Sequence, residues 1–329
     1  MSEQFQAYQI GKNDDGQRCV LTQLDDSDLM EGDVTVRVEY TTLNYKDGLA
    51  MTGRSPVIRK FPLTPGVDFS GTVIASEHAD FSQGDQVILN GFGVGEAHSG
   101  GYAQKARVSG DWLVPVPAGL DTRHAMAIGT AGYTAMLSVM ALEDHGTSPD
   151  DGDVLVTGAS GGVGSVALAI LSKLGYRVVA TTGSMNEKDF LLGLGAADVL
   201  DRAEFSAKAR PLGKELWSGA IDVAGGNTLA NVLSQLKYGG AAAICGLAES
   251  MSLPTTVAPF ILRGISMYGI DSVMASIAKR KTAWARLAAD LDLTLLDELS
   301  FDLDFADLPQ AAKDILDGKI RGRAVVKLP

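Results

Sequence analysis

Short apolar runs separated by turn residues fill the first 123 positions of the chain. In residues 34–38 valine alternates with threonine and arginine. Alternation with a period of two, broken by Gly, Pro and Asp, is typical of short β-strands. This part therefore predicts a β-rich, barrel-like domain. Further apolar runs of this kind occupy residues 71–74, 86–89 and 112–116.

The pattern changes at Asp121, which is placed to cap a helix over residues 124–143. Apolar strand-like runs and helical patterns then alternate, which is the order of a doubly wound parallel sheet, the Rossmann arrangement. The expected strands cover residues 154–157, 177–182, 220–223, 241–245 and 265–270.

The last part of the chain returns to a mixed pattern. It predicts a helix over residues 277–291, a strand at 299–303, a helix at 309–316 and a strand at 323–328. We expect this tail to rejoin the first domain. The predicted domains are thus a catalytic or substrate domain made of residues 1–123 and 274–329, and a dinucleotide-binding domain made of residues 124–273.

The turn after the strand at 154–157 is the most informative motif in the chain. Small residues stand at Ala159, Gly161 and Gly164, and a helical pattern begins at once. A strand, a glycine turn and a helix in this order predict dinucleotide binding, because small residues let a pyrophosphate approach the helix N-terminus. The contacts that we expect come from Ser160, Gly161, Gly162 and Val163. A tight structural turn is the alternative.

The end of the next strand indicates which dinucleotide is bound. Enzymes that prefer NAD place an acid here, to bind the ribose hydroxyls. This chain has Thr182, Gly183 and Ser184 instead. A carboxylate about 4 Å from a phosphate would cost about 4 kcal/mol at an effective dielectric of 20, so its absence favours NADPH. Downstream, Arg202 is a candidate partner for the 2′-phosphate, and Lys188 is another.

Composition excludes several classes of protein. The formal net charge of −12 argues against a surface for nucleic acid or anionic membrane. The two cysteines, Cys19 and Cys245, form no zinc motif and predict no disulfide framework. The first residues do not read as a secretion signal, and the most apolar stretches, such as residues 241–248, are too short to span a bilayer. We expect a cytoplasmic protein.

Several strings in the chain resemble one known family. Together with the β-rich first domain and the β tail, they are similar to the medium-chain dehydrogenase/reductase superfamily over essentially the whole chain. They resemble its quinone-oxidoreductase-like branch and, within that, NADPH-dependent acrylyl-CoA reductases. The strings are LNYKDGLAMTG (43–53), PGVDFSG (65–71), GFGVGEAHSGGYAQ (91–104), IGTAGYTAM (128–136), GASGGVGS (158–165) and PFILRGISMYGIDSV (259–273).

The resemblance implies a fold and further contacts. It implies a GroES-like first domain beside the Rossmann domain, and a homodimer formed by extension of the central sheet through an edge strand at residues 265–270. It implies that Leu247, Ile261, Ser272 and Arg323 contact the cofactor. Leu247 also follows an expected parallel strand, where such sheets bind ligands.

Two departures from relatives matter. Where zinc alcohol dehydrogenases of this superfamily have a Gly-His-Glu motif, this chain has PGVDFSG, with Asp68 in the acidic position and no histidine. We therefore expect no metal site. In addition, the tyrosine that serves as proton donor in related enoyl reductases is not found at the matching region, residues 53–56.

The implied reaction is reduction of acrylyl-CoA to propionyl-CoA, with hydride added at the β-carbon. It needs a donor to the thioester oxygen and an acid for the α-carbon. Asn44 and Tyr45 are the candidate catalytic residues, through an amide N–H and a phenol; capping of a turn is the alternative. Arg54, Arg59 and Lys60 form either a contact for the phosphates of coenzyme A or an exposed basic loop. The competing functions are reduction of small quinones with NADPH, and NADPH binding without turnover.

Overall fold

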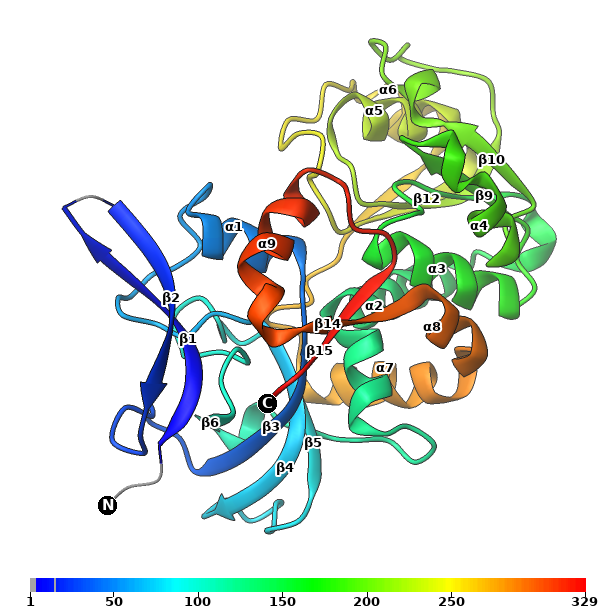
Figure 1. Cartoon of the computed structure of the whole chain (residues 1–329). Helices are drawn as coiled ribbons and strands as arrows, with labels where there is room; N and C mark the ends of the chain where they lie inside the picture. Colours follow the sequence, from blue (N-terminus) through cyan, green and yellow to red (C-terminus); the bar gives the residue numbers. More distant parts are fainter. Residues whose placement is uncertain (1–3, 15) are drawn as a thin grey trace. The chain divides into compact units, whose positions relative to one another are not determined.

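The computed structural model describes residues 4–14 and 16–329. The chain folds into two compact units (Figure 1). Unit 1 comprises the residues up to Thr130 together with Ser272–Ala288 and Leu296–Pro329. Unit 2 comprises Ala131–Asp271 and Ala289–Leu295. Each unit has its own sheet and its own apolar core.

A six-stranded parallel sheet forms the centre of unit 2, in the strand order β10-β9-β8-β11-β12-β13. The order reverses direction beside β8, as in a doubly wound nucleotide-binding fold. Apolar residues such as Leu155, Ala220 and Leu236 are buried against its helices. The strands are β8 (Val154–Val156), β9 (Val178–Thr182), β10 (Asp198–Asp201), β11 (Trp217–Asp222), β12 (Leu236–Ile244) and β13 (Ser266–Gly269).

Helices connect these strands, as parallel pairing requires. The α-helices are α3 (Gly162–Lys173), α4 (Lys188–Gly193), α5 (Gly226–Gln235) and α6 (Ala258–Arg263). Short 3₁₀ turns lie at η2 (Pro149–Asp151), η3 (Met185–Glu187) and η4 (Arg202–Phe205).

Unit 1 holds a seven-stranded sheet and a separate hairpin. The sheet has the order β14-β15-β3-β4-β5-β7, and β6 pairs with β3. Its buried side chains, including Val36, Phe69, Leu89 and Tyr102, form the core. The strands are β3 (Val34–Thr42), β4 (Asp68–Ser76), β5 (Gln86–Asn90), β6 (Lys105–Val108), β7 (Val114–Pro115), β14 (Ser300–Asp304) and β15 (Arg323–Lys327), with β1 (Phe5–Asn13) and β2 (Gly16–Leu24) in the hairpin.

The C-terminal tail joins the first part of the chain, as the sequence pattern predicts. Strand β15 pairs antiparallel with β3 and parallel with β14. Of the helices, α9 packs against α1 (Figure 1). Gly48 permits this contact, because a Cβ at this position would lie 2.8 Å from the carbonyl oxygen of Ala312. The helices of this part are α1 (Tyr45–Thr52), α7 (Ile277–Asp290), α8 (Leu293–Leu299) and α9 (Leu308–Leu316), with η1 (Gly110–Trp112) and η5 (Phe305–Asp307).

Helix α2 (Thr122–His145) is longer than the sequence pattern predicts and is kinked. The Asp121 carboxylate accepts a hydrogen bond of 2.7 Å from the backbone N–H of His124, which confirms its capping role. At Gly129 the backbone leaves the helix, with φ 51°. By its length and its apolar composition alone, this helix could span a bilayer. The expectation that the most apolar stretches are too short to do so is therefore wrong. Its most apolar window is 83% buried in the fold, as in a core helix of a globular protein.

One expected strand is mostly absent. The run at residues 112–116 contributes only the two residues of β7, because Trp112 belongs to the 3₁₀ turn η1. There its ring stacks on that of Phe92, with centroids 5.9 Å apart. The other expected strands are present, with ends shifted by a few residues.

Candidate active site

The glycine turn joins β8 to α3, as the sequence predicts. A Cβ at Gly164 would lie 2.4 Å from the carbonyl oxygen of Gly158, so this glycine is needed for close packing of helix on strand. Gly161 differs, because a Cβ there would meet only ordinary contacts, at 3.4 Å. Packing does not require a glycine at 161, which leaves room for a ligand at the N-terminus of α3. No side chain among the described residues caps this terminus, so its N–H groups are free to bind an anion.

The end of β9 meets this turn through hydroxyl groups. Ser160 Oγ and Thr182 Oγ1 lie 3.2 Å apart, and Thr182 Oγ1 accepts a bond of 3.1 Å from the N–H of Ser184. Arg202 lies against the same strand end: a Cβ at Gly183 would be 3.0 Å from Arg202 Cζ. Within the described part of the chain Arg202 has no ion-pair partner, so its charge is available to a ligand anion. The structure thus brings Ser160, Thr182, Gly183, Ser184 and Arg202 together at the end of β9.

The remaining predicted contacts lie at strand ends or on exposed helix surface. Leu247 follows β12 and is 55% exposed. Ile261 lies on α6 and is 72% exposed. Ser272 begins a segment of unit 1, where its carbonyl oxygen accepts a hydrogen bond of 2.9 Å from Arg280.

A cluster of buried carboxylates lies at the N-terminus of α1. Asn44 Nδ2 donates to Asp47 Oδ2 at 3.2 Å and to Asp68 Oδ2 at 3.0 Å. It also lies 2.9 Å from the hydroxyl of Thr42, which itself donates to Asp68 Oδ1 at 2.8 Å. Asp47 accepts the backbone N–H groups of Asn44 and Val67 at 2.9 and 3.0 Å. The amide nitrogen of Asn44 is thus directed to these carboxylates.

Arg323 is buried beside this cluster. Its Nε donates to the carbonyl oxygen of Ala127 at 2.9 Å, and its Nη2 has no hydrogen-bond partner among the described residues. Burial lowers the pKa of Arg323, while the carboxylates of Asp68 and Asp47 oppose this shift. Burial raises the pKa of Asp47, and its neighbour Asp68 raises it further. A buried arginine here compensates carboxylates that would be costly alone.

The kink in α2 completes the cluster. A Cβ at Gly129 would lie 2.6 Å from Arg323 Nη2 and 3.0 Å from Asp68 Oδ2, so no larger residue fits. The kink also turns the N–H of Thr130 toward Asp68 Oδ2, at 2.7 Å. Gly129 therefore leaves room for the Arg323 guanidinium and lets the backbone bind the Asp68 carboxylate.

Tyr45 is the first residue of α1 and differs from its neighbours in exposure. Its side chain is 44% exposed, whereas Asn44 and Asp47 are buried. The buried cluster fixes the start of the helix, and the phenol ring next to it remains accessible. Tyr45 is thus exposed, while the buried Asn44 and Asp47 hold the helix turn that carries it.

Arg280 is a site residue that the sequence pattern does not identify. It is 1% exposed, and its guanidinium stacks 4.2 Å from the ring centroid of Phe92. It donates to the carbonyl oxygens of Asn90 at 2.5 Å and Val273 at 2.7 Å, as well as to that of Ser272. A Cβ at Gly91 would lie 2.5 Å from the carbonyl oxygen of Val273 and 2.7 Å from Arg280 Nη2, so both groups approach this glycine closely. Arg280 therefore ties the loop at 91–95 to Ser272.

Two family models match the chain. The alcohol dehydrogenase GroES-like domain matches residues 30–118, and the zinc-binding dehydrogenase family matches residues 162–289. The "Probable acrylyl-CoA reductase AcuI" of Escherichia coli is 52% identical over 98% of this chain and 100% of its own length. The chain belongs to the medium-chain dehydrogenase/reductase superfamily.

Other members of the superfamily are nearly as similar. The "Acrylyl-CoA reductase AcuI" of Ruegeria pomeroyi is 51% identical, and 98% of each chain is covered. A solved oxidoreductase of Salmonella enterica in complex with NADP is 52% identical, with a TM-score of 0.97 over 98% of this chain and 100% of its own. A Bacillus subtilis structure with NAD bound is 43% identical, with a TM-score of 0.95 over 99% and 100% of the two chains. The fold is that of these oxidoreductases.

The description of one family model names zinc, but the residues around Asp68 do not fit a zinc site. The Asp68 carboxylate already accepts hydrogen bonds from Thr42, Asn44 and the N–H of Thr130, and the cation beside it is Arg323. Over residues 4–14 and 16–329, no three His, Cys, Asp or Glu side chains come together as metal ligands would.

Proposed function

We propose that this protein is an NADPH-dependent acrylyl-CoA reductase, which reduces the 2-enoyl thioester to propionyl-CoA without a metal. The identity of 51–52% over 98% of the chain to acrylyl-CoA reductases supports the substrate. The observation that carries the cofactor is Arg202 against Gly183 at a strand end that bears no acid. The Salmonella structure with NADP supports the same choice.

The chain's residues fit this cofactor in two places. In our proposal the N–H groups at the start of α3, from Gly162 and Val163, bind the pyrophosphate, and Ser160 and Gly161 lie beside it. Arg202, with Thr182, Gly183 and Ser184, binds the 2′-phosphate. The orphaned Nη2 of Arg323 is a further donor available to the cofactor. When bound, NADPH supplies the hydride for the β-carbon. The remaining proposed contacts are Leu247, Ile261 and Ser272.

Tyr45 and Asn44 have different roles in this proposal. The accessible phenol of Tyr45 contacts the cofactor or substrate and donates a hydrogen bond to the thioester oxygen, where negative charge develops. Asn44 acts through Tyr45: its amide is held by Asp47 and Asp68, so it fixes the start of α1 rather than donating to the substrate. This revises the expectation that the Asn44 amide itself serves the substrate.

Reduction of small quinones with the same cofactor is the second candidate, because several more distant relatives are quinone oxidoreductases. Measuring NADPH oxidation with acrylyl-CoA and with 1,4-benzoquinone separates the two. We expect kcat/KM to be higher for acrylyl-CoA. A large excess for benzoquinone would reverse the assignment, and no turnover with any enone or enoyl thioester would instead indicate a non-catalytic NADPH-binding protein.

We also propose that the protein is a cytoplasmic homodimer. Its free cysteines, Cys19 and Cys245, suit a reducing compartment. Strand β13 is an edge of the unit 2 sheet, and Met267 and Tyr268 on it are 37% exposed. Pairing of β13 with its copy would extend the sheet and cover this edge. Light scattering after size exclusion tests it: a monomer at micromolar concentration would contradict the proposal.

A further inference from the structure

A cavity of about 430 Å³ lies in unit 1 at the C-terminal end of α1. This volume is within the range of small-molecule sites. Part of its lining is apolar, from Met51, Pro309 and Cys19. Burial raises the pKa of the Cys19 thiol to about 12, so the thiol stays neutral. Thr52 and two cations, Arg54 and Lys313, complete the lining.

The two cations, Arg54 and Lys313, are available to bind an anion. Lys313 is exposed and makes no ion pair within residues 4–14 and 16–329. Arg54 Nη1 lies 3.4 Å from Asp317 Oδ1, and both side chains are at least 40% exposed. Such an exposed pair contributes little to stability, and Arg54 can exchange Asp317 for a stronger anion. Asp317 would keep its other partner, Lys319, at 3.1 Å.

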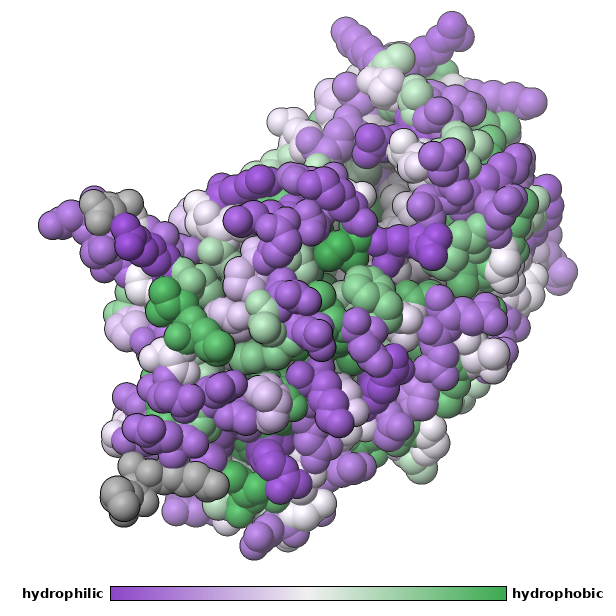
Figure 2. Space-filling model, in the orientation of Figure 1, coloured by the Kyte–Doolittle hydropathy of each residue, from purple (hydrophilic) through white to green (hydrophobic). Residues whose placement is uncertain are grey.

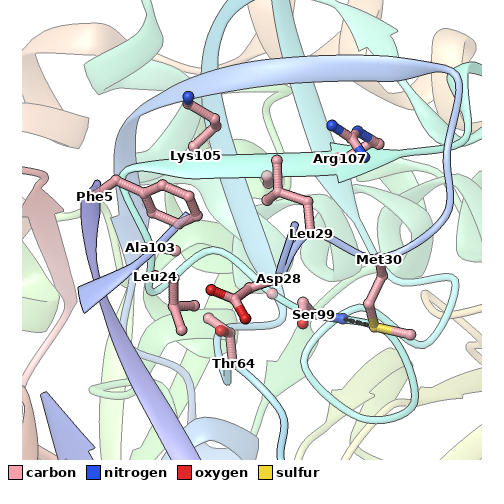
Figure 3. A pocket seen from close by; sticks show the side chains of 12 residues that line it. Phe5, Leu24, Asp28, Leu29, Met30, Thr64, Ser99, Ala103, Lys105 and Arg107 are labelled. Carbon is pink, nitrogen blue, oxygen red and sulfur yellow. Dashed lines mark hydrogen bonds between the residues drawn. The ribbon is translucent and has the colours of Figure 1, made fainter. Parts of the chain in front are cut away.

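The other cavity of unit 1 that we compare with it is much smaller. A second cavity, lined by Phe5, Leu24, Met30 and Lys105, measures only about 10 Å³ (Figure 3). That is room for one water molecule. In this small cavity the backbone N–H of Ser99 donates to the sulfur of Met30 at 3.1 Å, so that N–H already has a partner.

We infer that the cavity at Arg54 and Lys313 binds the adenosine 3′,5′-bisphosphate part of coenzyme A. This inference rests on the proposed function and names the site for the far end of its substrate. The apolar part of the lining suits a purine ring, and the two cations in the lining suit phosphates. In a chain with a net charge of −12, such a site needs local cations. Figure 2 shows mainly hydrophilic residues over α9 and the loop that follows it.

The length of α1 agrees with this assignment. Tyr45 begins the helix, and the cavity lies at its end, beyond Met51 and Thr52. Eight residues span about 12 Å at 1.5 Å per residue. The pantetheine arm of coenzyme A has a backbone as long as about four peptide residues, roughly 14 Å when extended. A thioester beside Tyr45 can therefore reach the cavity with its nucleotide end.

The test compares two substrates that differ only at this end. Acrylyl-CoA carries the nucleotide, and acrylyl-pantetheine lacks it. In the double variant Arg54→Gln/Lys313→Gln we expect KM for acrylyl-CoA to rise about tenfold, with kcat changed less than twofold and KM for acrylyl-pantetheine unchanged. The Gln side chains keep most of the aliphatic stems, and the two positions are exposed, so folding is preserved.

The matched control is Arg37→Gln/Lys279→Gln, which removes the same two charges from exposed positions on β3 and α7. It should leave both KM values unchanged. An equal rise in the control, an equal rise for both substrates, or no rise at all would overturn the inference. Reduction of acrylyl-CoA by the wild-type protein is measured before any variant is assayed. If the wild-type protein does not reduce acrylyl-CoA, this result contradicts the proposed function itself.

Inhibition gives an independent readout. Adenosine 3′,5′-bisphosphate should inhibit the wild-type enzyme competitively with acrylyl-CoA, and the Arg54→Gln/Lys313→Gln variant should be inhibited about tenfold more weakly. Inhibition competitive with NADPH, and equal in both proteins, would place the compound in the cofactor site and contradict the assignment.

Discussion

Replacing Gly183 by aspartate should change the coenzyme preference of the enzyme. The backbone of Gly183 is not in the left-handed region, so an L-residue fits it. A Cβ there would lie 3.0 Å from Cζ and Nη2 of Arg202, which is the end of a flexible side chain and can move. The new carboxylate would pair with Arg202 and occupy the place proposed for the 2′-phosphate.

The magnitude follows from two terms. Losing the charge-assisted bond between Arg202 and the phosphate costs roughly 2 kcal/mol. Repulsion between the carboxylate and the phosphate about 4 Å apart costs about 4 kcal/mol at a dielectric of 20, which exposure and salt reduce to about 1 kcal/mol. The sum of about 3 kcal/mol corresponds to roughly a hundredfold in affinity. The carboxylate can also accept hydrogen bonds from the ribose hydroxyls of NADH.

The assay is the ratio of kcat/KM for NADPH to that for NADH, at saturating acrylyl-CoA. We expect Gly183→Asp to lower this ratio about a hundredfold. Gly183→Ala, which adds the Cβ without a charge, should change it less than threefold. A fall in Gly183→Ala as large as that in Gly183→Asp, or equal losses with both coenzymes, would refute the reasoning.

Three further predictions concern catalysis and stability. Tyr45→Phe should lower kcat about tenfold or more, since a positioned hydrogen-bond donor to a developing oxyanion contributes at least that much; an unchanged kcat in steady-state assays would remove Tyr45 as this donor. Arg280→Met should lower the free energy of unfolding by about 2–4 kcal/mol, because buried carbonyl groups lose their donor; urea denaturation measures this, and a loss no larger than that of Lys279→Met would contradict it. Burial raises the pKa of Asp222 to about 6, so its folded form holds a proton that the unfolded chain releases near pH 4. Stability should therefore fall by about 2 kcal/mol as pH rises from 4 to 6, and Asp222→Asn should lose this part of the pH dependence in unfolding titrations.

Local patterns were sufficient for most of the fold. The strand, the turn with Gly161 and Gly164, and the following helix could be predicted because each depends on neighbouring residues alone. Arg202 could be placed near Gly183 because parallel strands end at one edge of a sheet.

Contacts between distant segments account for what the pattern missed. Arg280 occupies a position on the apolar face of its helix, three residues after Ile277 and four before Trp284, which is the one local signal of a buried cation. Its partners are carbonyl groups 190 residues earlier, at Asn90, and next to its own helix. The kink at Gly129 depends likewise on Arg323, almost 200 residues away. Neither contact follows from periodicity.

The roles of Asn44 and Asp47 could not be settled locally either. The sequence offers a turn cap and a substrate donor as alternatives for Asn44. The choice depends on Asp68, which β4 brings within 3.0 Å of the Asn44 amide. The direction of the Asn44 amide is therefore set by its buried contact with Asp68, and not by the residues next to Asn44 in the sequence.

The most direct test of the central claim is the destination of the hydride. NADPH deuterated at C4 of the nicotinamide, on the face that is transferred, is used to reduce acrylyl-CoA, and the product is examined by mass spectrometry and NMR. We expect one deuterium in propionyl-CoA, located at the β-carbon. Deuterium at the α-carbon, deuterium in neither position, or no propionyl-CoA would contradict it.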